Sequence, residues 1–176
     1  MQIRLLNKTL LTTYNHYYYM LSFDRLRPVN ENRLECFEIS DNNLDLIHLS
    51  GALKKMLHEQ PDCVKGYGFK DFDGNVIGHV FLMKRGGREV LYKIETIDAY
   101  LFAVRVFDEF RGRSYAGEMI THLVNKLREE GVESLYLTVK KNNASAIRVY
   151  EKLGFDLIGS KFFIRVWKYN VPYISL

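Results

Sequence analysis

Cysteine, proline and tryptophan are scarce in this sequence: its 176 residues include two cysteines, three prolines and one tryptophan. Cys36 and Cys63 stand apart and form no CxxC or CxxH pair, so the sequence indicates neither a disulfide framework nor a zinc site, and we expect no metal. No apolar run reaches the roughly 18 residues that a membrane span requires. These absences predict a cytoplasmic protein without a membrane partner.

Long runs of one charge are also absent, although the formal net charge is +4 and the isoelectric point is about 9.0. The basic residues are interspersed with acidic ones, which disfavours a nucleic-acid partner and favours a small anionic ligand. Hydrophobic residues make up 47% and charged residues 26%, as in an ordinary globular domain. The length fits a single domain over residues 1–176.

Leucines and tyrosines recur at three-to-four spacing in the first 30 residues, which predicts a helical lead over 1–30 that Pro28 closes. The recurring positions are Leu6, Leu10, Tyr14, Tyr17, Tyr18 and Leu21. We expect the tyrosine-rich part of this lead to cover the core. Lining an acceptor pocket and packing a dimer are the open alternatives.

Strand patterns dominate the middle of the chain. We expect a first strand over 34–40 and a helix over 44–59. Alternating apolar residues then predict an antiparallel meander from 64 to 107, with turns at Asp73-Gly74 and Gly86-Gly87.

The last third alternates helices and strands. An apolar stripe predicts a helix from Ala116 to Leu127, with Gly131 at its carboxyl end, and a strand follows over 134–141. The next helix, 144–153, has Asn142 or Asn143 as its cap and Gly154 as its stop. The segments FDLIG and KFFIRVW are predicted as two further strands. We therefore expect an α+β fold with a mixed, mostly antiparallel sheet.

A glycine and two arginines stand where the predicted strand ending at Phe107 gives way to a helix. The first turn of a helix has unpaired N–H groups and a partial positive charge, which together attract anions. Gly112 allows close backbone approach, while Arg111 and Arg113 add charge. The junction predicts a phosphate or diphosphate site; a plain turn with two solvated arginines is the alternative. Neither GxxxxGK[ST] nor a GxGxxG that opens a helix occurs.

Ser114 offers a function from another class, because Gly112 to Ala116 nearly spells the G-x-S-x-G turn of serine hydrolases. Such an enzyme needs an acid and then a histidine later in the chain. The only later histidine, His122, falls on the same predicted helix as Ser114, so a serine hydrolase stays a distant alternative.

Two motifs in this region resemble those of the GNAT superfamily of acyl-CoA-dependent N-acyltransferases. The family's R/Q-x-x-G-x-G/A is met at Arg111 and Ala116, whereas its central glycine is Ser114 here. If Ser114 needs a positive φ, the side chain adds strain on the order of 1 kcal/mol. The second motif, N-x-x-A-x-x-x-Y-x-K-x-G-F, is met by Asn143, Ala146, Tyr150, Lys152, Gly154 and Phe155.

The resemblance implies a V-shaped splay between two central parallel strands, with helices on both faces of the sheet. It implies acetyl-CoA as the cosubstrate and no metal. The pantetheine arm would pair with backbone groups around Val104 and Val106 and contact Asn143. The diphosphate would lie on the turn made by Arg111, Gly112, Arg113, Ser114, Tyr115 and Ala116.

The resemblance also implies that Tyr150 is the general acid near the thioester sulfur. A tyrosine is protonated at neutral pH and can donate its proton, although Tyr150 could simply pack in the core beside Ile147. The base stays open. Asp98 and Tyr100 share strand parity with Val104, and Glu95 and His79 are weaker candidates, with a structural or solvated role as the alternative for each.

These features predict an N-acetyltransferase that moves an acetyl group from acetyl-CoA directly to a primary amine within a ternary complex. The acceptor would be a small molecule or a peptide, which the sequence does not identify, and homodimer formation is left open. A non-catalytic acyl-CoA sensor on the same fold is the alternative, and a nucleic-acid-binding module is a distant third.

Overall fold

A computed structural model describes residues 2–5, 8–29, 32–89, 92–93, 99–166 and 169–173. Its elements follow in the order β1 (Gln2–Leu5), β2 (Lys8–Ser22), η1 (Phe23–Arg25), β3 (Leu34–Glu38), η2 (Leu44–Leu46), α1 (Gly51–Glu59), β4 (Val64–Asp71), β5 (Val76–Lys84), β6 (Arg88–Glu89), β7 (Tyr92–Lys93), β8 (Ala99–Val106), η3 (Asp108–Phe110), α2 (Tyr115–Glu129), β9 (Ser134–Lys140), α3 (Ala144–Leu153), β10 (Asp156–Val166) and β11 (Tyr169–Tyr173).

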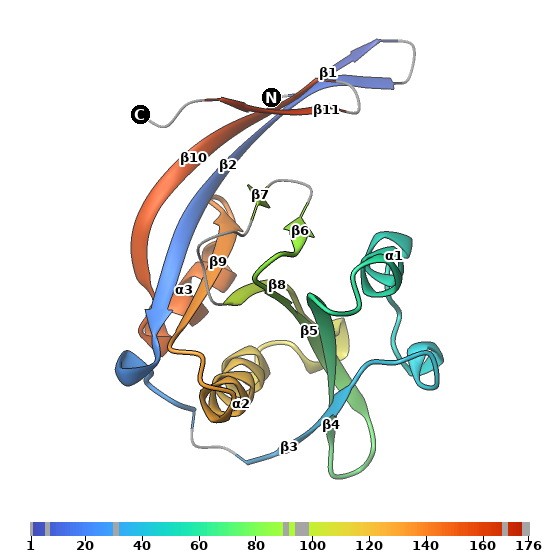
Figure 1. Ribbon diagram of the computed structural model, residues 1–176, viewed down its shortest axis with the longest axis vertical. Coiled ribbons are helices and arrows are strands. Elements are labelled where there is room, and N and C mark those ends of the chain that lie inside the picture. The colour runs from blue at the N-terminus through green and yellow to red at the C-terminus, as the bar shows by residue number, and fades with distance from the viewer. Residues whose placement is uncertain are drawn as a thin grey trace.

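Within the described residues, nine strands form one twisted sheet in the order β11-β10-β2-β9-β8-β5-β4-β3, with β1 paired to β2 (Figure 1). Neighbouring strands are antiparallel except for β8 and β9, which are parallel and lie in the middle of the sheet. A parallel pair needs a long crossover, and α2 supplies it between these two strands. The predicted mixed, mostly antiparallel sheet is confirmed.

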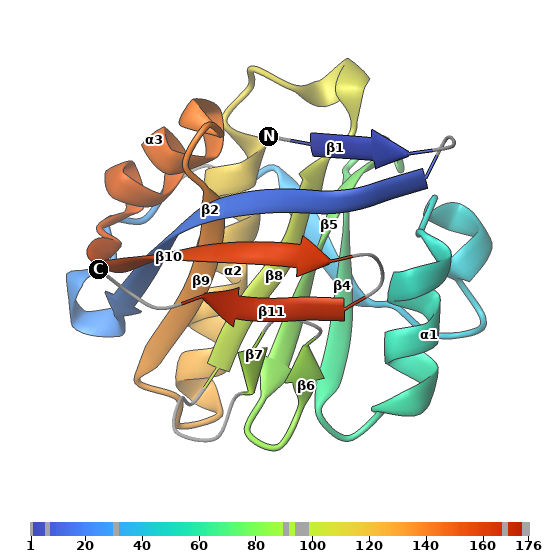
Figure 2. The same cartoon turned by 90° about the horizontal axis from the view of Figure 1, so that it is seen from above.

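Both faces of the sheet carry helices, as predicted. On one face, Val80 and Leu82 of β5 belong to a core that includes residues of α2 and α3. On the other, Phe81 and Met83 belong to a second core onto which α1 packs. This alternation follows from the two-residue period of a strand. Figure 2 shows α3 and α1 on opposite sides of the molecule, with β1, β2, β10 and β11 crossing above the central strands.

The sequence correctly predicts both ends of α3 and the glycine that follows α2. Asn143 Oδ1 accepts the Ala146 N–H at 3.3 Å and satisfies one of the unpaired donors of α3. Gly131 and Gly154 follow the two helices with φ of 79° and 97°, in the left-handed region that favours glycine. A Cβ at position 154 would lie 2.5 Å from the Arg25 carbonyl oxygen, so this end of α3 fits closely against the chain.

The predicted helical lead over 1–30 is wrong, because residues 8–22 form the strand β2 between β9 and β10. Tyr19 and Leu21 are buried in the core on the α2 side, two residues apart, as a strand requires. Aromatic and β-branched residues dominate this segment and favour a strand when partners lie on both edges. The three-to-four spacing of its apolar residues was therefore misleading.

Two smaller predictions also need correction. The helix expected over 44–59 is split into the short turn η2 and α1, because Ser50 caps α1 by accepting the Leu53 N–H. FDLIG and KFFIRVW contribute to a single strand, β10, which follows β2 along its length through one register shift.

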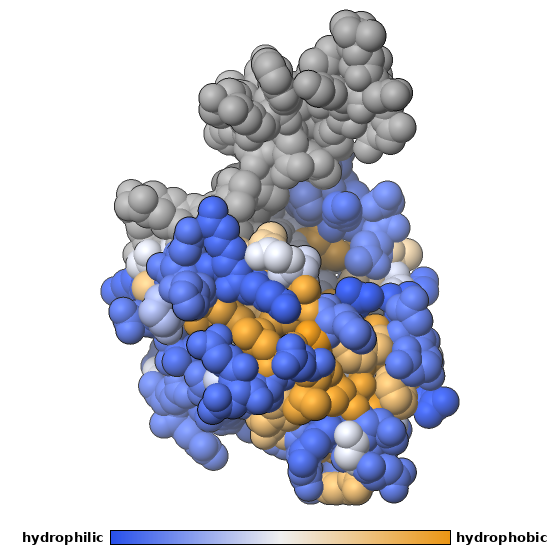
Figure 3. Space-filling view, turned by 90° about the vertical axis from the view of Figure 1, so that its right-hand side faces the viewer, coloured by the Kyte–Doolittle hydropathy of each residue, from blue (hydrophilic) through white to orange (hydrophobic). Residues whose placement is uncertain are grey.

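The surface on the α1 side gathers hydrophobic residues in its middle, with hydrophilic residues around them (Figure 3). Among the described residues, no helix combines the length and apolar character needed to cross a bilayer.

Candidate acetyl-CoA site

The two central strands pair only at their amino-terminal ends. The β8–β9 register holds Tyr100 opposite Tyr136 and Leu101 opposite Leu137, and no further pair joins these strands. β8 nevertheless continues to Val106 and β9 to Lys140. Just past the last pair, Ala103 has a φ of 49°, which breaks the regular strand conformation. The predicted V-shaped splay is therefore present.

A cavity of about 620 Å³ opens beside this gap, between the end of β8, the start of α2 and α3. Most of the predicted cofactor residues line it: Val104, Val106, Arg111, Gly112, Ser114, Tyr115, Ala116 and Asn143, together with Tyr150. Arg113 does not, and its carbonyl accepts a hydrogen bond from Arg33 Nη2 at 3.0 Å. Two segments that are separate in the sequence, 104–116 and 143–152, thus meet around one cavity.

The free edge of β8 faces this gap with backbone groups. Phe107 donates its N–H to the Ile77 carbonyl on the β5 side at 2.9 Å. Because N–H groups point alternately to the two edges of a strand, those of Val106 and Val104 point toward the gap. The Val106 carbonyl accepts a long hydrogen bond of 3.4 Å from Arg111 Nε. An extended ligand could therefore pair with β8 as an added strand does.

The turn before α2 presents several amides. Gly112 and Ser114 both adopt positive φ, 78° and 64°, and Ser114 is the N-cap residue without a side-chain cap bond. Within the described residues, no hydrogen bond engages the N–H groups from Gly112 to Ala116. The helix start adds partial positive charge beside these unpaired amides. This arrangement fits an anion such as a diphosphate.

Charged side chains surround the turn. Arg111 forms an exposed ion pair with Asp108 at 2.7 Å, so part of its charge is already compensated. Arg105, Arg148 and Lys152 also line the cavity. The sequence prediction of the site included none of these three residues. The four-residue spacing of Arg148 and Lys152 places both on one face of the helix that carries Tyr150.

Tyr150 lies on α3 at the wall of the cavity and is 8% exposed. Burial raises its pKa to about 12, so the hydroxyl is protonated at neutral pH. Its ring packs against Phe155, with centroids 5.6 Å apart, and against Tyr19 at 6.4 Å. The hydroxyl makes no hydrogen bond within the described residues. Tyr150 is therefore both part of the core and a lining residue.

The candidates for a base are distributed differently. Asp98 and Glu95 lie outside the described residues. Tyr100 shares a hydrogen bond of 2.7 Å with Thr138 Oγ1 beside the point where β8 and β9 part. His79 is 2% exposed and absent from the cavity lining; burial and then the nearby Arg105 charge lower its pKa to about 4. Within the described residues, no cluster of three or more metal-ligating side chains occurs.

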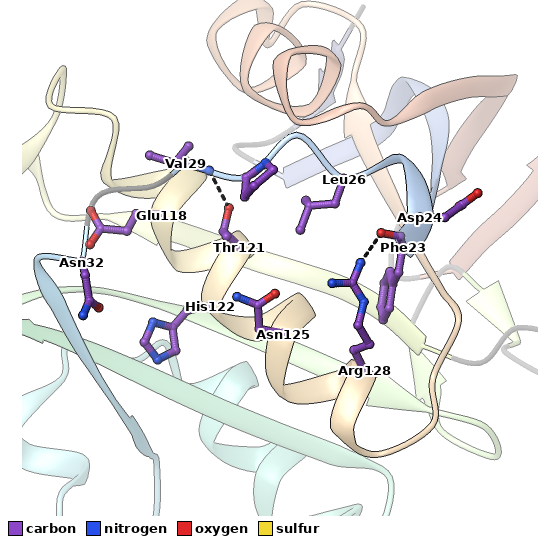
Figure 4. Close-up of a pocket in the computed structure, with 11 residues that line it drawn as sticks. Phe23, Asp24, Leu26, Val29, Asn32, Glu118, Thr121, His122, Asn125 and Arg128 are labelled. Carbon is purple, nitrogen blue, oxygen red and sulfur yellow. Dashed lines mark hydrogen bonds between the residues drawn. The ribbon is translucent and has the colours of Figure 1, made fainter.

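A second cavity, of about 450 Å³, lies between residues 23–29 and Asn32 on one side and α2 on the other (Figure 4). Its buried Thr121 hydroxyl accepts the Val29 N–H and donates to the Gly117 carbonyl, so this polar group is satisfied within the protein. His122 lines the same cavity and packs edge-on against Phe69. No hydrogen bond within the described residues joins it to Ser114, so the geometry of a hydrolase triad is not assembled.

Comparisons with known proteins agree with this geometry. The [ribosomal protein bS18]-alanine N-acetyltransferase of Escherichia coli K12 is 30% identical over 79 residues, which are 43% of this chain and 53% of that protein. Mycothiol acetyltransferase of Corynebacterium aurimucosum is 30% identical over 57 residues, 32% of this chain and 19% of that one. The chain thus spans about half the length of the first of these relatives, and less of the second.

The fold has many solved counterparts. A GCN5-related N-acetyltransferase from Sphaerobacter thermophilus superposes with a TM-score of 0.61 at 14% identity, over 93% of this chain and 54% of that one. The sequence pattern of the acetyltransferase (GNAT) family matches residues 26–155, which include β8, α2, β9 and α3. By this match, the chain belongs to the GNAT acetyltransferase family.

Proposed function

We propose that this protein is an N-acetyltransferase that transfers the acetyl group of acetyl-CoA to a primary amine. The observation that carries the proposal is the parting of β8 from β9 above a turn of free amides. The gap is bounded by extended backbone suited to the pantetheine arm. The turn from Arg111 to Ala116 suits the diphosphate, and Asn143, although it caps α3, keeps its amide nitrogen available for a contact.

Acetyl-CoA, when bound, supplies a thioester carbonyl for attack by the amine. The amine nitrogen forms a bond to the carbonyl carbon, and the bond from that carbon to sulfur breaks. Val106 N–H, turned toward the gap, can stabilise the oxyanion that develops on the carbonyl oxygen. The proton lost by the amine balances the proton gained by the departing sulfur.

Tyr150 donates a hydrogen bond to that sulfur. Its pKa of about 12 keeps the proton on the hydroxyl through the physiological range. The same high pKa disfavours a lasting phenolate, because a thiol of pKa about 8.5 is the stronger acid. Tyr150 therefore passes its proton to the sulfur, and the proton released by the amine replaces it on the hydroxyl.

The relatives suggest which acceptors to test first. One relative is named for acetylating an alanine of ribosomal protein bS18, and another is named a mycothiol acetyltransferase. Peptides with an amino-terminal alanine are therefore the first acceptors to test, followed by amino sugars and polyamines.

The experiment is a release assay for free thiol from acetyl-CoA with a panel of these amines, paired with calorimetric titration of CoA. We expect CoA binding and thiol release that depends on an amine, with release reduced in Tyr150→Phe. Binding without release for any amine would support the acyl-CoA sensor instead. Absence of CoA binding would contradict both the enzyme and the acyl-CoA sensor.

A further inference from the structure

Arg33, which precedes β3, is joined to the turn before α2 although the two lie 80 residues apart in the sequence. Its Nη2 donates to the Arg113 carbonyl at 3.0 Å, and its guanidinium lies over the Tyr115 ring, 4.5 Å from the centroid. Both partners belong to the amide turn itself. Arg33 does not line the cavity beside that turn.

Glu118 holds Arg33 in this place. The carboxylate is 3% exposed and accepts from Arg33 Nε at 3.1 Å and from the Arg33 backbone N–H at 2.6 Å. In Figure 4, Glu118 points from α2 toward the segment that carries Val29 and Asn32. A buried carboxylate with both oxygens engaged fixes the guanidinium plane. These partners of Arg33, namely Arg113, Tyr115 and Glu118, lie in the first turn of α2 or just before it.

The bond to the Arg113 carbonyl has a geometric consequence. The carbonyl of Arg113 and the N–H of Ser114 belong to one trans peptide plane, in which they point in opposite directions. A carbonyl held toward Arg33 turns the Ser114 N–H away from Arg33. Ser114 lines the cavity and Arg33 does not, so this orientation leaves the Ser114 N–H available on the side opposite Arg33.

The conformation of Ser114 explains why the turn needs this restraint. Its φ of 64° is unfavourable for a residue with a Cβ, so the turn has a tendency to relax to another conformation. A peptide plane fixed by Arg33 opposes that relaxation. The cation above Tyr115 further holds the ring that begins α2.

We infer that Arg33 is a positioning residue that fixes the peptide between Arg113 and Ser114, and thereby the diphosphate-binding amides, for the cosubstrate. This inference rests on the proposed function. It assigns Arg33 no contact with the ligand. Affinity for a ligand with a diphosphate should therefore depend on Arg33, whereas affinity for a ligand without one should not.

The test measures dissociation constants for CoA and for pantetheine, which lacks the diphosphate and nucleotide, by NMR titration of the full chain. The principal variant is Arg33→Met/Glu118→Gln, which keeps the net charge and leaves no unpaired buried carboxylate. Arg33→Lys retains a cation beside Glu118 but lacks the planar fork that reaches two acceptors. Arg27→Ala, an exposed arginine of the same segment, is the matched control.

We expect the dissociation constant for CoA to rise about tenfold in the double variant and about fivefold in Arg33→Lys, the size of one lost hydrogen bond. Pantetheine should bind all three variants within about twofold of the wild type, and Arg27→Ala should bind CoA normally. In a Ser114→Gly background, where the turn is unstrained, the loss caused by Arg33→Lys should shrink.

Three results would overturn the inference while leaving the proposed function intact. The first is an unchanged CoA affinity in both folded variants, Arg33→Lys and the double variant. The second is an equal loss of affinity for CoA and for pantetheine, and the third is a wild-type CoA affinity in Arg33→Lys together with a reduced one in the double variant. The last would indicate a direct charge contact with the ligand. A wild-type chain that binds neither ligand would instead overturn the proposed function, and this inference with it.

Discussion

Replacing Ser114 by glycine should stabilise the protein. Ser114 holds a φ of 64° and a ψ of 8° at the start of α2, and its side chain makes no cap bond. A left-handed conformation costs a residue with a Cβ about 1–2 kcal/mol. Glycine removes that strain but loses about 0.4–1 kcal/mol through the greater freedom of the unfolded chain. The net gain is about 0.5–1 kcal/mol, by the difference of these terms.

Urea unfolding at neutral pH and thermal scans measure this gain. For a chain of this size it corresponds to a Tm about 2 °C higher. Ser114→Ala is the matched control: it removes the hydroxyl, keeps the Cβ, and should change neither stability nor thiol release. A Ser114→Gly variant less stable than the wild type, or as stable as Ser114→Ala, would refute the argument from backbone strain.

Three further predictions concern the site and its supports. Tyr150→Phe should lower kcat about a hundredfold, because proton donation to the sulfur is lost, with CoA affinity unchanged in titration. The pKa of His79 is about 4 in the folded protein and 6.5 in the unfolded chain. Between these pH values only the unfolded chain binds the proton. The free energy of unfolding should therefore fall by up to about 3 kcal/mol from pH 6.5 to pH 4. His79→Gln should flatten that dependence in urea titrations at each pH. Gly154→Ala should lower the free energy of unfolding by at least about 3 kcal/mol, because the new Cβ would lie 2.5 Å from the Arg25 carbonyl oxygen. Gly131→Ala, whose Cβ would have no atom within 4 Å, should lower it by only about 1 kcal/mol in the same assay.

Each of these has a contrary outcome. Loss of CoA affinity in Tyr150→Phe would indicate a binding role, and unchanged kcat would remove the residue from the reaction. An acid dependence that survives His79→Gln would place the titrating group elsewhere. Equal costs for the two glycine variants would mean that the close approach at Gly154 relaxes freely.

The sequence predicted the second half of the fold well because its signals are local. Asn143 and Gly154 bound α3 through their own side chain or backbone freedom, and the pattern of α2 comes from one apolar stripe. From the sequence we expected strain at Ser114 if its φ were positive, and the φ of Ser114 is positive. The resemblance of the motifs placed the gap beside β8, which periodicity alone does not reveal.

The N-terminal strand and the Arg33 contacts could not be predicted in this way. β2 is a strand because β9 and β10 lie on its two edges, and both come more than a hundred residues later in the chain. Arg33 lies 85 residues from Glu118 and 80 residues from Arg113 in the sequence. No local spacing records such contacts, so the tertiary partners decided both features.

The most direct measurement of the central claim is an amide-resolved NMR titration of the isotope-labelled protein with CoA. The account predicts the largest shifts at the N–H groups of Val104 and Val106 and of residues 112–116, with little change around Thr121 and Asn125 in the second cavity. Shifts concentrated at that second cavity, or no saturable shifts along β8 and the start of α2, would contradict it.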